Sequence, residues 1–478
     1  MNKLVSIGLV ILLWCAPAMA ELVECRQDAQ TAIAVTIYNS NLGLIKDVRN
    51  LTLKTGVQEV KFMDVAGQIN PVTVHVKSLK APGELAVLEQ NYEYDLLNAQ
   101  KLLDKFVGKT VKLVDKNYYT GKEEIVTAEL LSNNNGPIFR INNEIHINAP
   151  GRVILPEIPD NLIAQPTLVW MLNNKSKQPH QVEASYLTQG INWRADYIVL
   201  ISDDNRKADL NGWVSIDNQS GATYRNATVK LVAGDINRVR EEMPLRKAAR
   251  AQAADSLAKE KQFQEESFFE YHLYTLERPS TIKDRQTKQI ELLSAADIPI
   301  KERLTYYGAD YYYRDRYDGQ MQSPQKVGVF LDVVNKKEHN LGMPLPAGVI
   351  RAYKKDASGS LQFIGEDRIV HTPKDEKITV KMGDAFDVVA ERKQTAYKIL
   401  TRNAAQRFDT EQSWEITVRN HKDRPVEVEV IEPIPGDWNI EQSSQPFEKI
   451  EAHTVKFPLK IDKDKSATIT YTVKIRYY

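Results

Sequence analysis

YLTQGINWRADYIVLISDDNRKADLNGWVSIDNQSGATYRNATVKLVAGDINRV, residues 186–239, has the clearest strand alternation and turn chemistry in the chain. Three strands are expected in it, each with one apolar face, and those faces are formed by Ala195, Tyr197, Val199 and Ile201, then Leu210, Gly212, Val214 and Ile216, then Ala227, Val229, Leu231 and Ala233. Turns are expected between them at the polar residues 203–205 and at 218–221, which ends in Gly221. Three antiparallel strands at near-regular spacing predict part of a β-sandwich.

The rest of the chain has similar short apolar runs, separated by Gly, Pro and Asn, so the predicted fold class is mainly β with several antiparallel sandwich or small-barrel domains. The expected parts are an N-terminal β domain at 21–105 that ends in a connector helix, a small SH3-like barrel at 106–160, a central β-sandwich at 161–239 and 268–400, a helical insertion at 240–267, and a C-terminal Ig-like β-sandwich at 401–478.

The insertion differs in composition from the strands around it. REEMPLRKAARAQAADSLAKEKQFQEE is rich in Ala, Lys, Glu and Gln, which favour helix. A partner-binding or coiled-coil arm is one interpretation. A solvated, partly frayed helix is favoured, because no heptad of Leu or Ile is sustained.

The first 20 residues have the features of a secretory signal peptide. Lys3 precedes an apolar run from Leu4 to Trp14, and cleavage is expected between Ala20 and Glu21. A lipid anchor on Cys15 is the alternative, disfavoured because Trp14 stands where a small residue is required. No later segment is apolar enough to cross a bilayer, so we expect an exported chain, periplasmic or extracellular, with no transmembrane segment.

Charge and cysteine content limit the function classes. The 63 basic and 63 acidic residues balance, and loss of Lys3 with the leader leaves one net negative charge, so there is no electrostatic signature of a nucleic-acid partner. Cys25 is the only cysteine expected in the mature chain, which rules out an intramolecular disulfide there. A reactive thiol or an intermolecular bridge at Cys25 is the functional alternative to an incidental residue.

Catalytic and cofactor motifs are missing from the sequence. There is no HExxH, CxxC, GxSxG, P-loop or dinucleotide glycine fingerprint, and the eight histidines never pair at ligand spacing, so no cofactor or metal is expected. The acidic residues of Gly365-Glu366-Asp367 and Gly383-Asp384 could serve glycosidic acid–base chemistry, but turn geometry selects Gly and Asp anyway.

A tyrosine-rich stretch within residues 304–325 is the candidate ligand-binding segment. Tyrosines can stack on sugars or grip peptides through flat faces and hydroxyls, and the candidates here are Tyr306, Tyr307, Tyr311, Tyr312, Tyr313 and Tyr317. An ordinary edge strand or loop is the alternative. Asp310, Asp315 and Asp318 do not match the spacing of a calcium loop.

Several short stretches together resemble a bacterial secreted family known as domain of unknown function 4139, some of whose relatives are labelled mucoidy inhibitor A. The stretches are YLTQGINW at 186–193, NGWVSIDN at 211–218, LVAGD at 231–235, FEYHLYTL at 269–276, KQIEL at 288–292, PLPAG at 344–348, GED at 365–367 and VRNHK at 418–422, and the resemblance covers 168–478. It implies an envelope location and a β-rich architecture, and it implies no reaction.

Two functions follow as expectations. The first is a secreted, non-enzymatic envelope protein that binds or scaffolds another envelope protein or a glycan. The alternative is a glycan-acting hydrolase whose site is built from dispersed carboxylates. A pocket with facing carboxylates would favour the hydrolase, and an open tyrosine-bearing face would favour binding.

Overall fold

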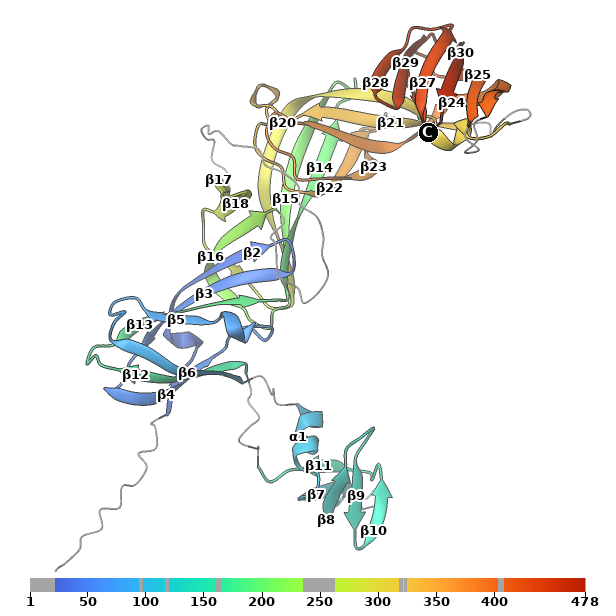
Figure 1. Ribbon diagram of the computed structural model, residues 1–478. Coiled ribbons are helices and arrows are strands. Elements are labelled where there is room, and N and C mark those ends of the chain that lie inside the picture. Colours follow the sequence, from blue (N-terminus) through green and yellow to red (C-terminus); the bar gives the residue numbers. More distant parts are fainter. Residues whose placement is uncertain are drawn as a thin grey trace, which may run out of the picture. The chain divides into compact units, whose positions relative to one another are not determined.

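The protein is described by a computed structural model covering residues 22–93, 98–116, 120–157, 159, 165–234, 263–317, 321, 325–402 and 408–477 (Figure 1). Within these ranges the chain forms 30 strands and one α-helix. The prediction of a mainly β fold is therefore confirmed. The expected signal peptide, with the expected cleavage between Ala20 and Glu21, lies outside the described residues, as does Cys15.

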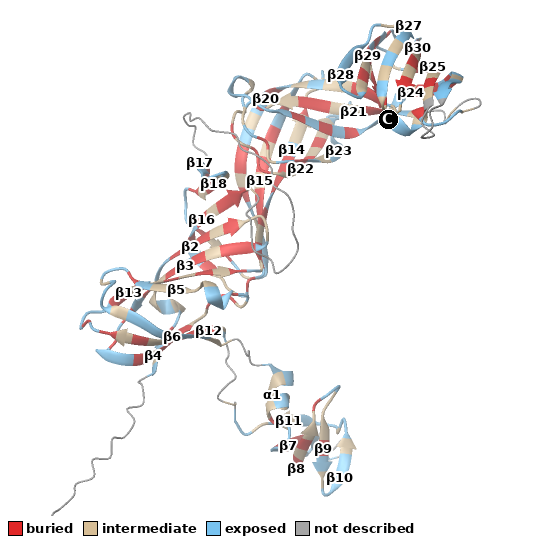
Figure 2. Cartoon of the chain, in the orientation of Figure 1, coloured by how far each residue is buried: buried red, intermediate tan, exposed pale blue. Residues whose placement is uncertain are grey.

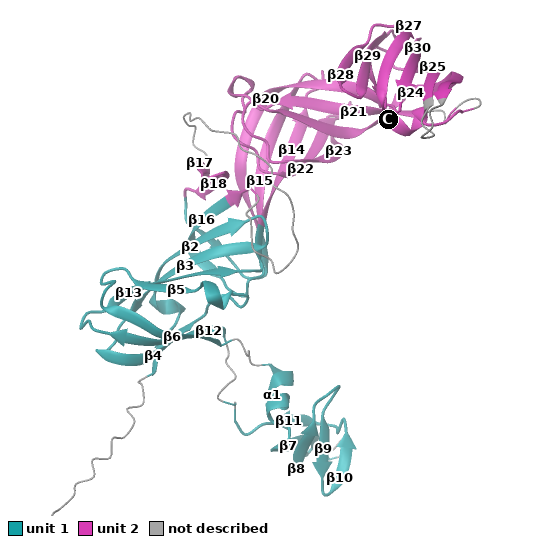
Figure 3. Ribbon diagram, in the orientation of Figure 1, with its two compact units in different colours: residues 1–192, 217–231, 278–287 teal, residues 193–216, 232–277, 288–478 magenta. Residues whose placement is uncertain are grey.

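The chain divides into two compact units (Figure 3). The first comprises 1–192, 217–231 and 278–287, and the second comprises 193–216, 232–277 and 288–478. In the part of the chain that the structure describes, no helix is both long and apolar enough to cross a bilayer.

Outside the segment 98–157, most strands of the first unit belong to two sheets, several of whose strands carry buried apolar residues (Figure 2). Four strands form one sheet in the order β1 (Leu22–Cys25), β4 (Gly56–Met63), β12 (Thr167–Asn174) and β6 (Leu85–Glu93). The other sheet has β2 (Gln30–Tyr38), β3 (Leu42–Leu51), β13 (His180–Thr188) and β5 (His75–Ser78) as neighbours. Buried residues alternate with more exposed ones along much of β2, β3, β4, β12 and β13, and the fully buried ones include Val35, Ile37, Ile45, Val60, Phe62 and Trp170. Burial of each large apolar side chain contributes about 1.5–3 kcal/mol to the free energy of unfolding.

Strands β12 and β13 depart from the expected domain boundaries. We expected residues after 161 to begin the central sandwich, but β12 pairs with β4 and β6, and β13 pairs with β3 and β5. The alternation at 168–172 and 182–186 identifies the strands correctly. It does not reveal their partners, which lie more than 70 residues earlier in the sequence.

The segment at 98–157 is a small module of its own within the first unit. Helix α1 (Ala99–Lys105) begins at Asn98, whose side-chain oxygen accepts the backbone N–H of Lys101 at 2.9 Å. Five strands follow in the spatial order β10 (Glu144–Ile147), β9 (Ile138–Ile141), β8 (Glu123–Ser132), β7 (Thr110–Lys116) and β11 (Arg152–Ile154). The order is open, with β10 and β11 at its ends, so the expected small barrel is an unclosed sheet.

The central stretch follows its predicted faces closely. Strand β14 spans Ile191–Ile201, β15 spans Lys207–Asn218 and β16 spans Tyr224–Ala233. The predicted apolar faces of β15 and β16 are buried, as are three of the four predicted positions on β14. Strand β16 does not extend the sheet of β14 and β15 but lies beside β2 in another sheet. The chain passes from one sheet to the other through the turn at 218–221. At this turn the Asn218 side-chain amide donates to the carbonyl oxygens of Ala222 and Lys283.

In the second unit, β14 and β15 belong to a sheet whose order is β23 (Leu361–Ile369), β22 (Gly348–Lys355), β14, β15, β20 (Gln286–Tyr307), β21 (Gln325–Val334) and β24 (Lys377–Arg402). The β14–β22 pair is parallel. Strand β24 is 26 residues long and continues into the C-terminal sandwich, so the expected boundary at 400 falls inside one strand. The expected helical insertion at 240–267 lies mostly outside the described residues. Its last five residues are not helical but belong to the six-residue strand β17 (Phe263–Phe268), which pairs with β18 (Tyr271–Leu276).

The C-terminal strands pack around one core, as expected for an Ig-like sandwich. They are β25 (Phe408–Asn420), β26 (Val426–Pro433), β27 (Asp437–Ser443), β28 (Glu448–Glu451), β29 (Thr454–Ile461) and β30 (Ser466–Arg476). On one side of the core the hydrogen-bonded strands follow the order β24, β25, β30, β27, and on the other side they follow the order β20, β26, β29, β28. The core between them includes Trp414, Ile416, Val430, Phe457 and Tyr471.

Candidate functional site

The end of β20 turns two successive tyrosines to opposite faces of one sheet. Because side chains alternate along a strand, Tyr306 points into the C-terminal core and Tyr307 points outward. Tyr306 is 1% exposed and Tyr307 is 53% exposed. Only the second can therefore present its ring to a ligand.

The remaining four candidate tyrosines do not form one open face either. Tyr313 is fully buried in the core, and Tyr312 and Tyr317 are half-buried against it. Tyr311 is 53% exposed and packs on Tyr312, with 4.5 Å between the ring centroids. The stretch that we expected to bind ligands is thus largely the edge of a core, with Tyr307 and Tyr311 as its exposed members.

A buried ion pair fixes the inward tyrosines. The side chains of Arg392 and Glu432 are both 0% exposed, and the guanidinium donates two hydrogen bonds to the carboxylate, one of 2.8 Å from Nη1 to Oε2. The Tyr313 hydroxyl donates to Glu432 Oε2 at 2.6 Å and the Tyr471 hydroxyl donates to it at 3.1 Å. Burial raises the pKa of both tyrosines well above its ordinary value, so they act as donors.

Aromatic rings surround the same guanidinium. The Cζ atom of Arg392 lies 4.9 Å from the ring centroid of Tyr312 and 5.5 Å from that of Trp414. Burial alone would lower the pKa of Arg392, but the negative charge of Glu432 raises it well above its ordinary value. The cluster therefore stays charged and closed to solvent, and its role is to hold the tyrosine stretch on the sandwich.

The outer face of the sheet that contains β20, β21 and β26 carries a cavity of about 950 Å³, which we call the Arg303 groove. Its floor is set by strand register: β20 pairs with β21 on one side and in parallel with β26 on the other, and β26 pairs with β29. Residues that face outward at these strands line it, namely Lys301, Arg303, Tyr307, Asp332, Val334, Lys377, Glu429, Ile431, Thr454 and Lys456.

The centre of the groove is a network around Asp332. Arg303 Nε donates to Asp332 Oδ2 at 3.0 Å, Lys377 Nζ lies 2.9 Å from the same oxygen, and Thr379 Oγ1 donates to Oδ1 at 2.7 Å. Burial alone would raise the pKa of Asp332, but the hydrogen bonds from Arg303, Lys377 and Thr379 hold that pKa below its ordinary value. This carboxylate is consequently ionised at neutral pH.

Arg303 itself is held from several sides. Its Nη1 donates to Thr305 Oγ1 at 2.9 Å and lies 3.5 Å from Glu429 Oε2. Its Cζ lies 5.1 Å from the ring centroid of Phe330. Phe330 in turn meets Tyr307 edge to face, with a centroid separation of 6.0 Å and an interplanar angle of 74°. The groove therefore combines an aromatic ledge with a fixed array of donors and acceptors.

The environment of Asp332 differs from that of a glycosidic general acid. Glycosidic acid catalysis needs a carboxyl whose pKa is raised, so that it carries a proton at neutral pH. Asp332 has the opposite environment. Across the described ranges, no group of three or more His, Cys, Asp and Glu side chains is placed to hold a metal ion.

The two acid-bearing motifs considered from the sequence lie in strands and are engaged with neighbours. Asp367 accepts the backbone N–H of Lys381 at 2.7 Å, and Glu366 pairs with Arg351 at 3.1 Å. Asp384 lies 3.0 Å from the Nζ atom of Lys381. These contacts link β23 to β22 and to β24 and form no facing carboxylate pair.

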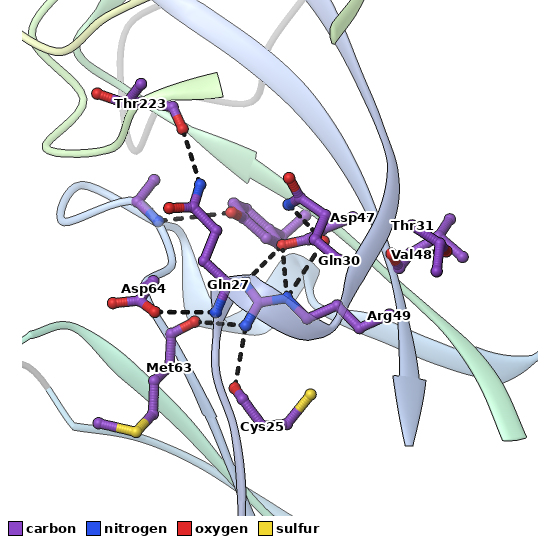
Figure 4. A network of polar contacts seen from close by, with 12 residues as sticks. Cys25, Gln27, Gln30, Thr31, Asp47, Val48, Arg49, Met63, Asp64 and Thr223 are labelled. Atoms are coloured by element: carbon purple, nitrogen blue, oxygen red, sulfur yellow. Dashed lines mark hydrogen bonds and ion pairs between the residues drawn. The ribbon is translucent and has the colours of Figure 1, made fainter. Parts of the chain in front are cut away.

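A second buried charge lies in the first unit (Figure 4). The Arg49 guanidinium donates to Asp47 Oδ2 at 2.7 Å and to the carbonyl oxygens of Cys25 at 3.0 Å and Met63 at 2.8 Å. Its Cζ lies 3.8 Å from the ring centroid of Phe62. Cys25 is itself buried, and burial raises the pKa of its thiol. The arrangement joins strands β1, β3 and β4 and leaves the thiol shielded.

Sequence reasoning found Tyr307 but missed the residues around it. Arg303, Phe330, Asp332 and Lys377 come from three strands, and no motif links them in sequence. One signal was present: Lys301, Arg303, Thr305 and Tyr307 alternate at every second position, which marks a polar outward face on one strand.

The second unit is thus a mainly β structure with an open groove on one sheet face. Residues 182–477, more than half of the chain, match the family described as a domain of unknown function, DUF4139, and the chain belongs to that family. The resemblance inferred from the sequence is confirmed. A comparison with curated proteins gives no match.

Proposed function

We propose that this chain is an exported, non-enzymatic protein of the bacterial cell envelope that binds or scaffolds another envelope component through the Arg303 groove. The observation that carries the proposal is the exposed Tyr307 ring beside a preformed polar network, in a groove of about 950 Å³. Pockets of this size with a few fixed polar groups and aromatic walls are typical ligand sites. Export is proposed from the features of the first 20 residues.

Preorganisation supports binding as the role. Arg303 and Asp332 are already held by protein partners, so a ligand need not order them on arrival. The hydrolase alternative has less support, because the Asp332 carboxyl has a lowered pKa and the buried Glu432 is 0% exposed.

Cosedimentation of the purified mature protein with the isolated, insoluble envelope fraction tests the proposal. We expect wild type and Tyr311→Ala to sediment with that fraction and Tyr307→Ala to remain largely in the supernatant. Equal sedimentation of all three, or release of soluble sugar from the envelope fraction by the wild type, would contradict the proposal. Tyr311 is the matched control because its exposed fraction equals that of Tyr307.

A further inference from the structure

Resting on the proposed function, we infer that the Arg303 groove takes an uncharged, hydroxyl-rich glycan chain. The inference depends on four features of the groove: an aromatic ledge, a fixed hydrogen-bonding array, balanced charge and a floor whose central strands, β20 and β26, each have two neighbours.

The aromatic ledge is suited to a sugar ring. Tyr307 is 53% exposed, and Phe330 supports it from the side at a centroid distance of 6.0 Å. An aromatic ring that is apolar on its face and polar at its hydroxyl can pack against the C–H face of a pyranose and hydrogen-bond at the rim. The ledge therefore provides a stacking surface whose position is fixed by the strand pair β20 and β21.

The polar array beside the ledge contains both donors and acceptors. Arg303 and Lys377 present N–H groups, while Asp332, Glu429 and Thr454 present oxygens. A sugar hydroxyl both donates and accepts, so neighbouring hydroxyls can engage donors and acceptors that alternate over a short distance. Mutual hydrogen bonds hold Arg303 and Asp332 in place, which reduces the entropy lost on binding.

Ion pairs within the protein hold most of the charged side chains of the groove, and Lys301 and Glu451 add one charge of each sign. Arg303 lies against Asp332 and Glu429, Lys377 lies against Asp332, and Lys456 Nζ lies 2.7 Å from Glu448. An anionic polymer would gain little net attraction from these cations and would meet the carboxylates of Asp332 and Glu429. The balance of charge therefore favours an uncharged ligand over an anionic one.

The floor of the groove argues against an added peptide strand. Peptides that extend a sheet need an unpaired strand edge. Here β20 has β21 and β26 as neighbours, and β26 has β20 and β29. Recognition on this floor must use side chains, which suits a glycan better than an extended backbone.

The test is titration calorimetry of the purified protein, residues 21–478, with defined probes. The uncharged probes are maltohexaose, cellohexaose and chitohexaose, the anionic probe is hexagalacturonate, and the peptide probe is an alternating Ala-Ser octapeptide. We expect at least one uncharged hexasaccharide to bind wild type and neither of the other two probe classes to do so.

Four variants locate the binding. We expect Tyr307→Ala to weaken it at least tenfold and Asp332→Asn to weaken it severalfold. Tyr307→Phe keeps the ring and is expected to stay within about threefold of wild type, and Tyr311→Ala is expected to match wild type. Unchanged melting temperatures of the Tyr307 and Tyr311 variants confirm that they are folded.

Each other outcome overturns the inference. Binding of hexagalacturonate or the peptide in a Tyr307-dependent way, without binding of an uncharged glycan, refutes the ligand class and leaves the proposed function standing. Glycan binding that Tyr307→Ala leaves unchanged refutes the site. Absence of binding by all probes refutes the inference, while the proposed function is decided separately by cosedimentation.

Discussion

Replacement of Glu432 by Gln is expected to destabilise the C-terminal sandwich strongly. The change keeps the side-chain shape but removes the negative charge that faces Arg392, whose side chain is 0% exposed. Removal of one partner of a buried ion pair costs about 3–5 kcal/mol. At roughly 2–4 °C per kcal/mol for a unit of 150–250 residues, the melting temperature should fall by about 6–20 °C.

Two further variants make this prediction specific. Glu427→Gln is the exposed control, because Glu427 and its partner Lys460 have side-chain exposures of 71% and 87%, and a surface pair contributes about 0–1 kcal/mol. The double variant Arg392→Met with Glu432→Met removes both charges and should recover part of the loss. Calorimetric unfolding measures all three. A melting temperature for Glu432→Gln within about 1 °C of the Glu427→Gln value would refute the reasoning.

The remaining predictions concern a thiol, a carboxylate and a glycine. Burial raises the pKa of Cys25, so its reaction with a disulfide reagent near neutral pH should be slow in native protein and fast in urea, and rapid native labelling would contradict this. The pKa of Asp332 is lowered in the folded state, so its contribution to stability is complete above the ordinary aspartate value of 3.8 and is lost as the pH falls through the lower folded value. The difference in unfolding free energy between wild type and Asp332→Asn should therefore shrink in that acidic window. A difference that does not change with pH would argue against the network. Gly348→Ala should lower the free energy of unfolding by about 1–3 kcal/mol, because the added Cβ would lie 2.3 Å from the Ala195 carbonyl oxygen. Gly83→Ala, whose Cβ would meet nothing within 4 Å, should leave that free energy nearly unchanged, and chemical denaturation measures both.

Local patterns predicted the strands well because alternation is a property of one strand at a time. The face of β15 that carries Leu210, Val214 and Ile216 is buried as expected. Which strands pair with one another could not be predicted from these patterns. The Leu304–Val428 pairing of β20 with β26 joins residues more than 100 apart, and nothing in either strand alone specifies the other.

The candidate site shows the same division. Composition drew attention to the tyrosines, but six aromatic residues in one stretch do not reveal which face the core. Tyr306 and Tyr307 are chemically identical neighbours, and only the parallel pairing with β26 turns the first inward and the second outward. The charged half of the groove could not be predicted, because Arg303 and Asp332 meet through strand register.

Hydroxyl-radical footprinting of the purified protein tests the location of the binding site most directly. In the free protein Tyr307 and Tyr311 are equally exposed, at 53%, so their oxidation rates should be similar. With a solubilised envelope glycan fraction added, oxidation of Tyr307 should slow at least severalfold while that of Tyr311 stays unchanged. Equal oxidation of Tyr307 with and without that fraction, under conditions where the protein is bound, would contradict the account.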